Sequence, residues 1–402
     1  MDTLSTVDRN AELGRRLTEI TLGLDRLGSR TAREAGNDDY EDLVPIFIGT
    51  SLVSPSDLPD WCSARAELDR LAADVDMLET GARRTFLTEM IRSLRASATY
   101  LSGEPIGFVE KVRELVGVPA ETVPDEEVDA IHSRLDRLLA ARGFSNGTLA
   151  ERVTAWQTGR YLDPLAIPAE FDRLMATAKE RTDRMIWPTG DYTMRLNAVR
   201  DVPYAGRCSF ADGTMDINLD VLVTRSGLKH LVCHEVFPGH STQLLSTLAV
   251  AKRGESPLDA LLCTTNAVTG AVQEGIGDQG IELIDWVEDE DDAAQIEVRR
   301  LQTATGTNAA WHLHCSGWTR EQSIAYLEDV GFGQRSWATV RTGMALHPFR
   351  GIFLASYWFG NETVRALRLA ATDETSRTRL LEALFRQVHS VTSLRLAAGA
   401  AA

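Results

Sequence analysis

The sequence predicts a mainly α-helical fold with one small β-sheet. Between residues 1 and 180, apolar residues recur three or four positions apart with charged residues between them, as in amphipathic helices. Around 187–220 this spacing gives way to turn residues and to alternation of polar and apolar residues, which is typical of short strands. Helical periodicity returns after Arg225 and continues to the end. We therefore expect a large helical fold that carries a small sheet in its middle.

The first part of the chain contains a series of helical segments that Pro-rich and Gly-rich turns separate. These segments are LTEITLGLDRL, ELDRLAADVDMLE, FLTEMIRSLRAS, FVEKVRELVGV, IHSRLDRLLAARG and FDRLMATAKERTDRMI. A chain of 402 residues is long enough for one large domain or two ordinary ones. We place a boundary near residue 185, with a helical N-terminal region over 1–185 and a second region over 186–402. One continuous domain with a shared core is also compatible with the pattern.

The alternating segment GTMDINLDV predicts one or two short strands directly before the motif CHEVFPGHSTQ. We expect DINLD (216–220) to form an edge strand. An edge strand can hold an extended substrate by main-chain pairing, and it can equally be plain scaffold.

Composition and charge restrict the possible partners and the compartment. The 42 Lys and Arg residues against 58 Asp and Glu residues leave a net charge of −16, which argues against a nucleic-acid partner. No apolar run approaches the roughly 18 residues that cross a bilayer, so we expect no membrane partner. The first residues are polar and charged, which predicts a cytoplasmic protein. Five scattered cysteines without a C-x-x-C pair predict reduced thiols.

The motif CHEVFPGHSTQ holds two histidines, His234 and His240, at a spacing that an unbroken helix does not favour. With Ser226 as the expected N-cap, a helix would carry His234 and Glu235 near its end. Continuing that helix would turn His240 by about 600°, away from the face of His234. Pro238-Gly239 should interrupt the helix and can return His240 to that side. Taken alone, the two histidines fit surface or core positions as well as a metal site.

A hydrolytic zinc site needs a third protein ligand and one open position. Ser256-Pro257 predicts a helix start, and Glu274 and Asp278 would follow on that helix, one turn apart and on one face. Glu274 can bind the metal while Asp278 accepts the ring N–H of a ligating histidine. The glycines of GIGDQG (275–280) match a dinucleotide fingerprint, but they lie inside a helical pattern rather than after a strand. We therefore expect no nucleotide site there.

At these residues the sequence resembles the domain-of-unknown-function 885 family. The matching features are H-E-x-x-P-G-H at 234–240, Gln243, Glu274-Gly275, GWTREQSIAYL (317–327) and SYWFG (356–360). The likeness covers about 187–365. The family is similar to gluzincin-type zinc peptidases, and its mainly helical fold is related to that of carboxypeptidase Taq.

The resemblance implies one zinc ion per chain, bound by His234, His240 and Glu274. It implies that Glu235 is the general base and not a ligand. 

The resemblance also implies substrate-side roles for three further residues. His314 would face the substrate, and Tyr357 would donate to a developing oxyanion. Arg341 matches an arginine of the family. From the sequence itself, His347 and Arg350 either extend the pocket or belong to an exposed loop.

The chain departs from the family pattern at the substrate side. Ala310 stands where the family has an aspartate, EGIGDQGIE lacks two aromatic residues, and HPFRGIFLA (347–355) replaces a P-G-Q segment. The metal ligands are kept while the surrounding walls differ. The resemblance therefore implies zinc more directly than it implies a substrate.

These residues predict a zinc-dependent hydrolase of amide or peptide bonds. Glu235 would act as general base on a metal-activated water, and the substrate would be a small peptide or an amide-bearing small molecule. An alternative is a zinc-dependent biosynthetic enzyme (a lyase, isomerase or cyclase) in which Glu235 shuttles protons. A third hypothesis is a non-catalytic metal-binding protein. Glu235 argues against it, because a structural zinc site needs no base.

Overall fold

The computed structural model describes residues 6–37, 41–202, 204 and 206–399. It confirms a mainly α fold with one small sheet. The chain divides into two compact units. The first unit comprises 1–121, 243–275 and 345–402, and the second comprises 122–242 and 276–344. Residue 185 lies inside the second unit, and the first unit collects three separated stretches of the chain.

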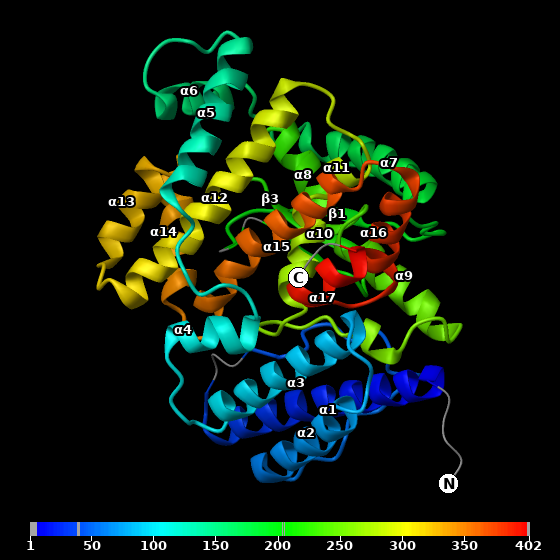
Figure 1. Cartoon of the computed structure of the whole chain (residues 1–402). Helices are drawn as coiled ribbons and strands as arrows, with labels where there is room; N and C mark the ends of the chain where they lie inside the picture. Colours follow the sequence, from blue (N-terminus) through cyan, green and yellow to red (C-terminus); the bar gives the residue numbers. More distant parts are fainter. Residues whose placement is uncertain (1–5, 38–40, 203, 205, 400–402) are drawn as a thin grey trace. The chain divides into compact units, whose positions relative to one another are not determined.

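The first unit begins with three helices that lie side by side (Figure 1). They are α1 (Thr6–Glu34), α2 (Trp61–Val75) and α3 (Ala82–Leu101). Leu17, Leu68 and Leu87, one from each helix, are fully buried in their shared core. The remaining elements that lie wholly in this unit are α4 (Phe108–Lys111), the π-helical turn η1 (Val112–Val116), the 3₁₀ turn η2 (Leu258–Leu261), α15 (Arg350–Ala370), α16 (Glu374–Arg386) and α17 (Val391–Ala398). Helix α17 packs on α3.

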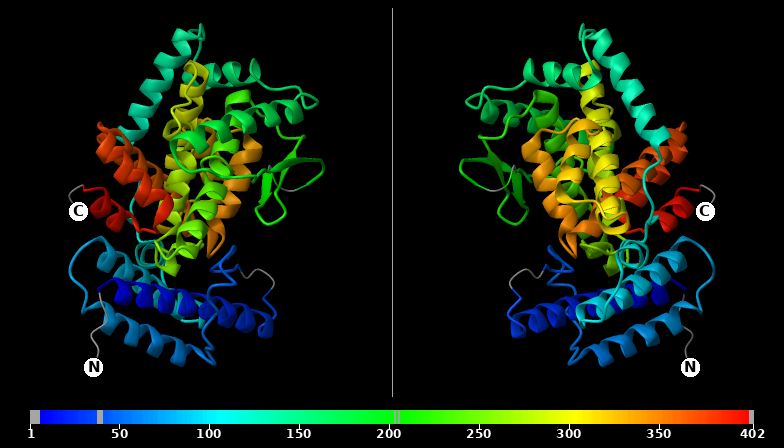
Figure 2. Two further views of the ribbon diagram at one scale, coloured as in Figure 1. Left: turned by 90° about the vertical axis from the view of Figure 1, so that its right-hand side faces the viewer. Right: turned by 90° about the vertical axis from the view of Figure 1, so that its left-hand side faces the viewer.

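The second unit is built around its longest helix, α12 (Glu290–Cys315), which packs against α5, α8 and α13. Figures 1 and 2 show α5 running beside α12. Its other helices are α5 (Asp125–Ala141), α6 (Leu149–Thr158), α7 (Ile167–Met185), α8 (Arg225–Glu235), α11 (Gly280–Leu283) and α13 (Arg320–Asp329). Three helices cross the division between the units, namely α9 (His240–Lys252), α10 (Gly270–Asp278) and α14 (Arg335–Leu346).

The sheet has three strands where one or two were expected, and its order corrects the sequence prediction. The strands are β1 (Arg195–Val199), β2 (Gly206–Ser209) and β3 (Thr214–Asn218), in the order β1-β3-β2. Strand β3 pairs in parallel with β1 and antiparallel with β2. The expectation that DINLD forms an edge strand was therefore wrong. Both sides of β3 are already hydrogen-bonded, so β3 offers no free edge to a substrate.

The sheet and α8 share one apolar core in the second unit. Met215 and Ile217 of β3 point into it, and Val232 and Phe237 meet them from α8 and the residues after it. The alternation that predicted β3 thus marks its buried face. This packing anchors the C-terminal end of α8 beside the sheet. Within the described residues, no helix has both the length and the apolar character to cross a membrane.

Candidate metal centre

Helix α8 carries His234 and Glu235 in its last turn. Its N-cap is Thr224, whose side chain accepts a hydrogen bond from the amide of Gly227 at 3.0 Å. The expectation that Ser226 caps this helix was wrong, because Thr224 has the extended backbone that an N-cap needs. Ser226 lies inside the helix, and its hydroxyl donates to Asp292 at 2.8 Å.

The helix is interrupted between the two histidines, as the Pro238-Gly239 pair predicts. Helix α8 ends at Glu235 and α9 begins at His240. The rings of His234 and His240 lie 4.8 Å apart, centroid to centroid, with their planes at 89°. A Cβ atom on Gly239 would lie 1.7 Å from the carbonyl oxygen of His234, so the turn requires glycine. The interruption therefore brings the two imidazoles together.

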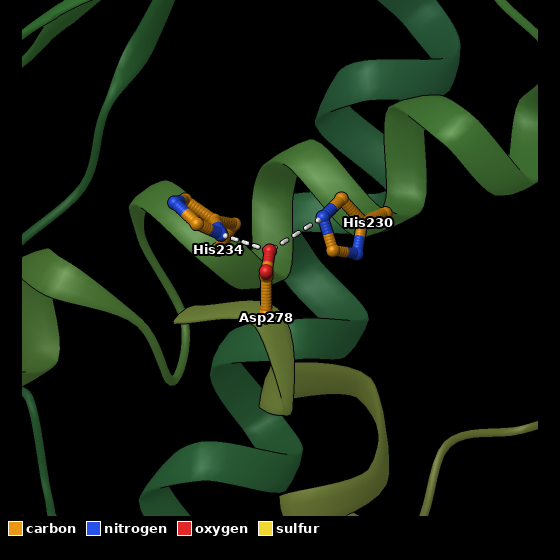
Figure 3. Close-up of side chains that lie close together, drawn as sticks. All are labelled: His230, His234 and Asp278. Atoms are coloured by element: carbon orange, nitrogen blue, oxygen red, sulfur yellow. Dashed lines mark hydrogen bonds and ion pairs between the residues drawn. The ribbon is translucent and has the colours of Figure 1, made fainter. Parts of the chain in front are cut away.

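Asp278, the last residue of α10, lies at the centre of a polar cluster (Figure 3). Its Oδ1 is 3.1 Å from Nδ1 of His234 and 3.4 Å from Nε2 of His230. Arg299 of α12 donates to the same oxygen through Nε at 3.0 Å. The carboxylate is fully buried. Asp278 was expected to accept the ring N–H of a ligating histidine, and its ring partners here include His234. That His234 binds a metal stays a prediction.

The charge of Asp278 determines which ring nitrogen of His234 carries a proton. Burial alone would raise the pKa of Asp278, but Arg299 and the hydrogen bonds from His230 and His234 hold that pKa well below its usual range. An ionised carboxylate only accepts hydrogen bonds, so Nδ1 of His234 is the donor. The proton on Nδ1 leaves the lone pair of Nε2 available to a metal ion.

Sequence reasoning did not assign His230 to the cluster. His230, His234 and Asp278 offer ligand atoms within 4.8 Å of one another. Burial lowers the pKa of His230 despite the nearby carboxylate, so its ring is neutral around pH 7. The available signal was the four-residue spacing of His230 and His234, which places both on one face of α8. The guanidinium of Arg299 at the same oxygen disfavours a cation bound directly to Asp278.

Gly277 makes room for the ring of His234. A Cβ atom at this position would lie 2.8 Å from Nδ1 and 2.9 Å from Cε1 of the imidazole. Helices seldom carry glycine in their interior without a packing reason, since it costs about 1 kcal/mol relative to alanine. The close approach of α10 to His234 is that reason.

Glu274 lies on α10, one turn before Asp278, so the two carboxylates leave the helix on one face. The spacing prediction is confirmed, but the expected helix start at Ser256-Pro257 was wrong. The short turn η2 follows Pro257, and α10 begins separately at Gly270. GIGDQG lies within α10, Gln279 and the start of α11, and in the described chain no strand leads directly into it.

Glu235 follows His234 directly, and its side chain meets the sheet. Cys208, on β2, lies close enough to Glu235 for the carboxylate to act on its thiol. Burial raises the pKa of the Cys208 thiol, and the charge of Glu235 raises it further. The thiol therefore stays protonated beside Glu235. The backbone of Glu235 is also held, because its carbonyl accepts from the Ser241 hydroxyl at 3.0 Å.

Two predicted substrate residues belong to the second unit. His314 is exposed in the last turn of α12. Arg341, on α14, places its guanidinium over the ring of Trp337 at 5.5 Å and packs near Gly306 of α12. Their roles toward a substrate stay predictions.

The other three predicted substrate residues belong to the first unit, where local contacts occupy them. Tyr357 meets the ring of Phe353 edge to face at 5.5 Å. His347 accepts the amide hydrogens of Phe349 and Arg350 on Nδ1, at 3.2 and 3.1 Å, and so caps the start of α15. The Arg350 side chain pairs with Glu41. The predicted contacts of Tyr357, His347 and Arg350 with substrate stay predictions.

The fold and the cluster together define a mainly helical protein with a small mixed sheet and a group of histidines and carboxylates. Its fold is similar to the crystal structure of a candidate lipoprotein from Colwellia psychrerythraea, with a TM-score of 0.60 and 16% identity. That match covers 85% of this chain and 70% of the other. A candidate lipoprotein of unknown function from Shewanella oneidensis matches with a TM-score of 0.49 and 15% identity, over 92% and 72% of the two chains. No family model and no curated protein matches the chain. At 16% identity the likeness to the Colwellia psychrerythraea protein describes the fold alone.

Proposed function

We propose that this protein is a zinc-dependent hydrolase of amide or peptide bonds, with zinc held by His234, His240 and Glu274. One observation carries the proposal. Asp278 binds Nδ1 of His234, which presents Nε2 of that ring as a ligand beside the ring of His240. Two imidazoles and one carboxylate form a ligand set that hydrolytic zinc sites use.

The neighbouring residues support the fit of a metal ion. Gly239 allows the turn that returns His240 to His234, and Gly277 leaves space for the ring of His234. Glu274 extends from the same face of α10 as Asp278, so one helix supplies both the ligand and the carboxylate that orients a ligand. Zinc would supply a Lewis acid that polarises a carbonyl and lowers the pKa of water to about 7.

Glu235 has the position and the surroundings of a general base. It directly follows a ligand without belonging to the ligand set, and the protonated Cys208 thiol lies near its carboxylate. Glu235 accepts the proton of the attacking water and delivers it to the leaving nitrogen. Tyr357 and His314 remain the proposed donors to the oxyanion, and loss of such a donor reduces turnover by about 10²–10³-fold in comparable enzymes.

The substrate class follows from the same proposal. A metal with a general base suits hydrolysis of a small peptide or an amide-bearing small molecule in the cytoplasm. The resemblance to the domain-of-unknown-function 885 family supports zinc and peptide-bond chemistry.

Metal content tests the ligand set. Purified wild-type protein should carry about one zinc ion per chain, and His234→Ala and Glu274→Ala should lose it. His312→Gln is the matched control, because His312 stacks on Trp318 at the far end of α12. Undiminished zinc in both ligand variants would overturn the site.

Product analysis tests the reaction. Glu235→Gln should retain zinc and lose turnover by about 10²–10⁴-fold. Peptides and amide-bearing small molecules are incubated with wild type and with this variant. Mass spectrometry then measures the masses of the products. Products that contain the elements of one added water support hydrolysis. Products of unchanged total mass support the biosynthetic alternative instead.

A further inference from the structure

The second unit contains a groove with a volume of about 410 Å³. Residues before and at the start of α8 form one wall, and residues of α12 and of the start of α14 form the others. Gly227, Gln302 and Trp337 mark these three walls. All the described residues that line the groove belong to the second unit.

The lining of this groove carries no charge. None of the described lining residues is Asp, Glu, Lys, Arg or His, although 25% of the chain is charged. Five carboxamides supply much of its polarity, namely Gln157, Asn218, Gln295, Gln302 and Gln334. In the described chain, the carboxamides of Gln157 and Gln302 make no hydrogen bond, so their donors and acceptors are available to a ligand.

Apart from Thr224 and Ser336, the rest of the described lining is glycine, apolar or aromatic. Tyr161, Phe332 and Trp337 contribute rings, and the side chains of Val221, Leu222 and Val340 are 43%, 56% and 67% exposed. Scattered exposed apolar residues are ordinary, but a cluster of them around a groove marks a binding surface. Neutral carboxamides beside apolar walls match a ligand that is itself apolar and uncharged but contains amide groups.

The groove and the cluster of His230, His234 and Asp278, called the His234 cluster here, share two helices. On α8, Gly227 in the groove wall shares a face with His230 and His234. On α12, Gln295 and Gln302 of the groove flank Arg299, which binds Asp278. Gly227 and His234 are seven positions apart on α8, which corresponds to about 10 Å along the helix axis. An extended peptide spans that distance with about three residues.

We propose that this groove binds the uncharged, apolar or aromatic part of an amide substrate whose reacting bond lies at the His234 cluster. The proposal rests on the proposed function, and it adds the class of substrate. A charged group placed in the groove would lose hydration without gaining an ionic partner, because the described lining offers none. The groove therefore selects neutral segments over acidic or basic ones.

Binding of matched probes tests this without requiring turnover. The probes are N-acetyl-phenylalanyl-leucinamide, which is uncharged, and N-acetyl-aspartyl-glutamic acid amide, which carries two negative charges. Calorimetry measures both on the full-length zinc-loaded protein. Val340→Asp introduces a charge into the groove at a position exposed enough to tolerate it. Leu165→Asp is the matched control, because Leu165 is 86% exposed and lies outside the groove.

We expect the uncharged probe to bind wild type and Leu165→Asp equally, and Val340→Asp about tenfold more weakly. The charged probe should bind all three proteins more weakly than the uncharged probe binds wild type. Equal affinity of the uncharged probe for Val340→Asp and wild type would overturn the proposal, as would preference for the charged probe. A dimer in sedimentation that Val340→Asp dissociates would also overturn it, since the groove would then hold a second copy of the chain.

The outcomes separate this proposal from the proposed function. Probe binding that Val340→Asp weakens, without hydrolysis of any amide, supports the groove and rejects hydrolysis. Amide hydrolysis whose preference for neutral substrates is the same in Val340→Asp and wild type supports hydrolysis and rejects the groove.

Discussion

Gly277 lies against the imidazole of His234 so closely that a methyl group on Gly277 would come within 2.8 Å of Nδ1. The same nitrogen donates to Asp278, the next residue of α10. Two neighbouring residues of one helix therefore hold one ring, Gly277 by leaving space and Asp278 by accepting a hydrogen bond. The orientation of the proposed zinc ligand thus depends on where α10 lies.

Gly277→Ala should weaken zinc binding by displacing this ring. The added methyl group must push the imidazole or the helix, because the ring atoms are not the flexible end of a long side chain. We expect a loss of tenfold or more in zinc affinity, measured by competition with a chelating dye. Gly306→Ala is the control, since its nearest contact would be 3.7 Å and it also lies inside a helix. Unchanged affinity in Gly277→Ala would show that the ring is free to move.

Asp278→Asn should lower zinc affinity by about 10–100-fold. The carboxamide is neutral, so it no longer stabilises the Nδ1-protonated tautomer of His234 and leaves Arg299 without its anion. Asp212→Asn, in an exposed turn after β2, is the control for the loss of one negative charge. Equal affinity of Asp278→Asn and wild type would remove Asp278 from its proposed role in orienting His234.

Lys229→Met should destabilise the second unit by about 3–5 kcal/mol. Lys229 is on α8, fully buried, and its ammonium lies 2.5 Å from Asp292 and 4.2 Å from the centre of the Trp286 ring. Removing the cation leaves the buried Asp292 carboxylate without its ionic partner, although Ser226 and the amide of Glu288 still donate to it. Denaturant unfolding measures the loss. The double variant Lys229→Met, Asp292→Asn should recover part of it, and no recovery would contradict a paired-charge cause.

Local sequence patterns were sufficient to predict much of the fold and the spacing of the candidate ligands. Apolar periodicity predicted the helices, Pro238-Gly239 predicted the break before His240, and the four-residue spacing predicted that Glu274 and Asp278 share a face. Each of these depends on a few consecutive residues whose backbone preferences agree.

Long-range pairing was not accessible from the same patterns. Alternation marks β3 as a strand but carries no information on which strands flank it, so its central position was missed. Asp278 contacts Arg299, which is 21 positions away in the sequence. It also contacts His230, which is 48 positions away. The buried ion pair of Lys229 and Asp292 joins residues 63 positions apart. The two discontinuous units likewise arise from contacts that no short window contains.

His389 should make the first unit sensitive to acid. Burial, and secondarily the charge of Arg83, lowers the pKa of His389 to about 4. An unfolded histidine binds its proton near pH 6.5, so between about pH 4 and 6.5 the unfolded chain holds more protons than the folded one. Stability from this group is complete above pH 6.5 and is lost as the pH falls toward 4, by up to about 3 kcal/mol.

His389→Gln isolates this effect, because glutamine cannot take up the proton. Urea unfolding of both proteins between pH 4 and 7.5 gives the comparison. Asp25, whose pKa burial raises to about 6, contributes the opposite trend, since its folded carboxyl group binds a proton that the unfolded chain releases. Both proteins keep Asp25, so its contribution cancels in their difference. The free-energy difference between wild type and His389→Gln should therefore shrink or reverse as the pH falls through this window, and a constant difference would contradict a neutral buried His389.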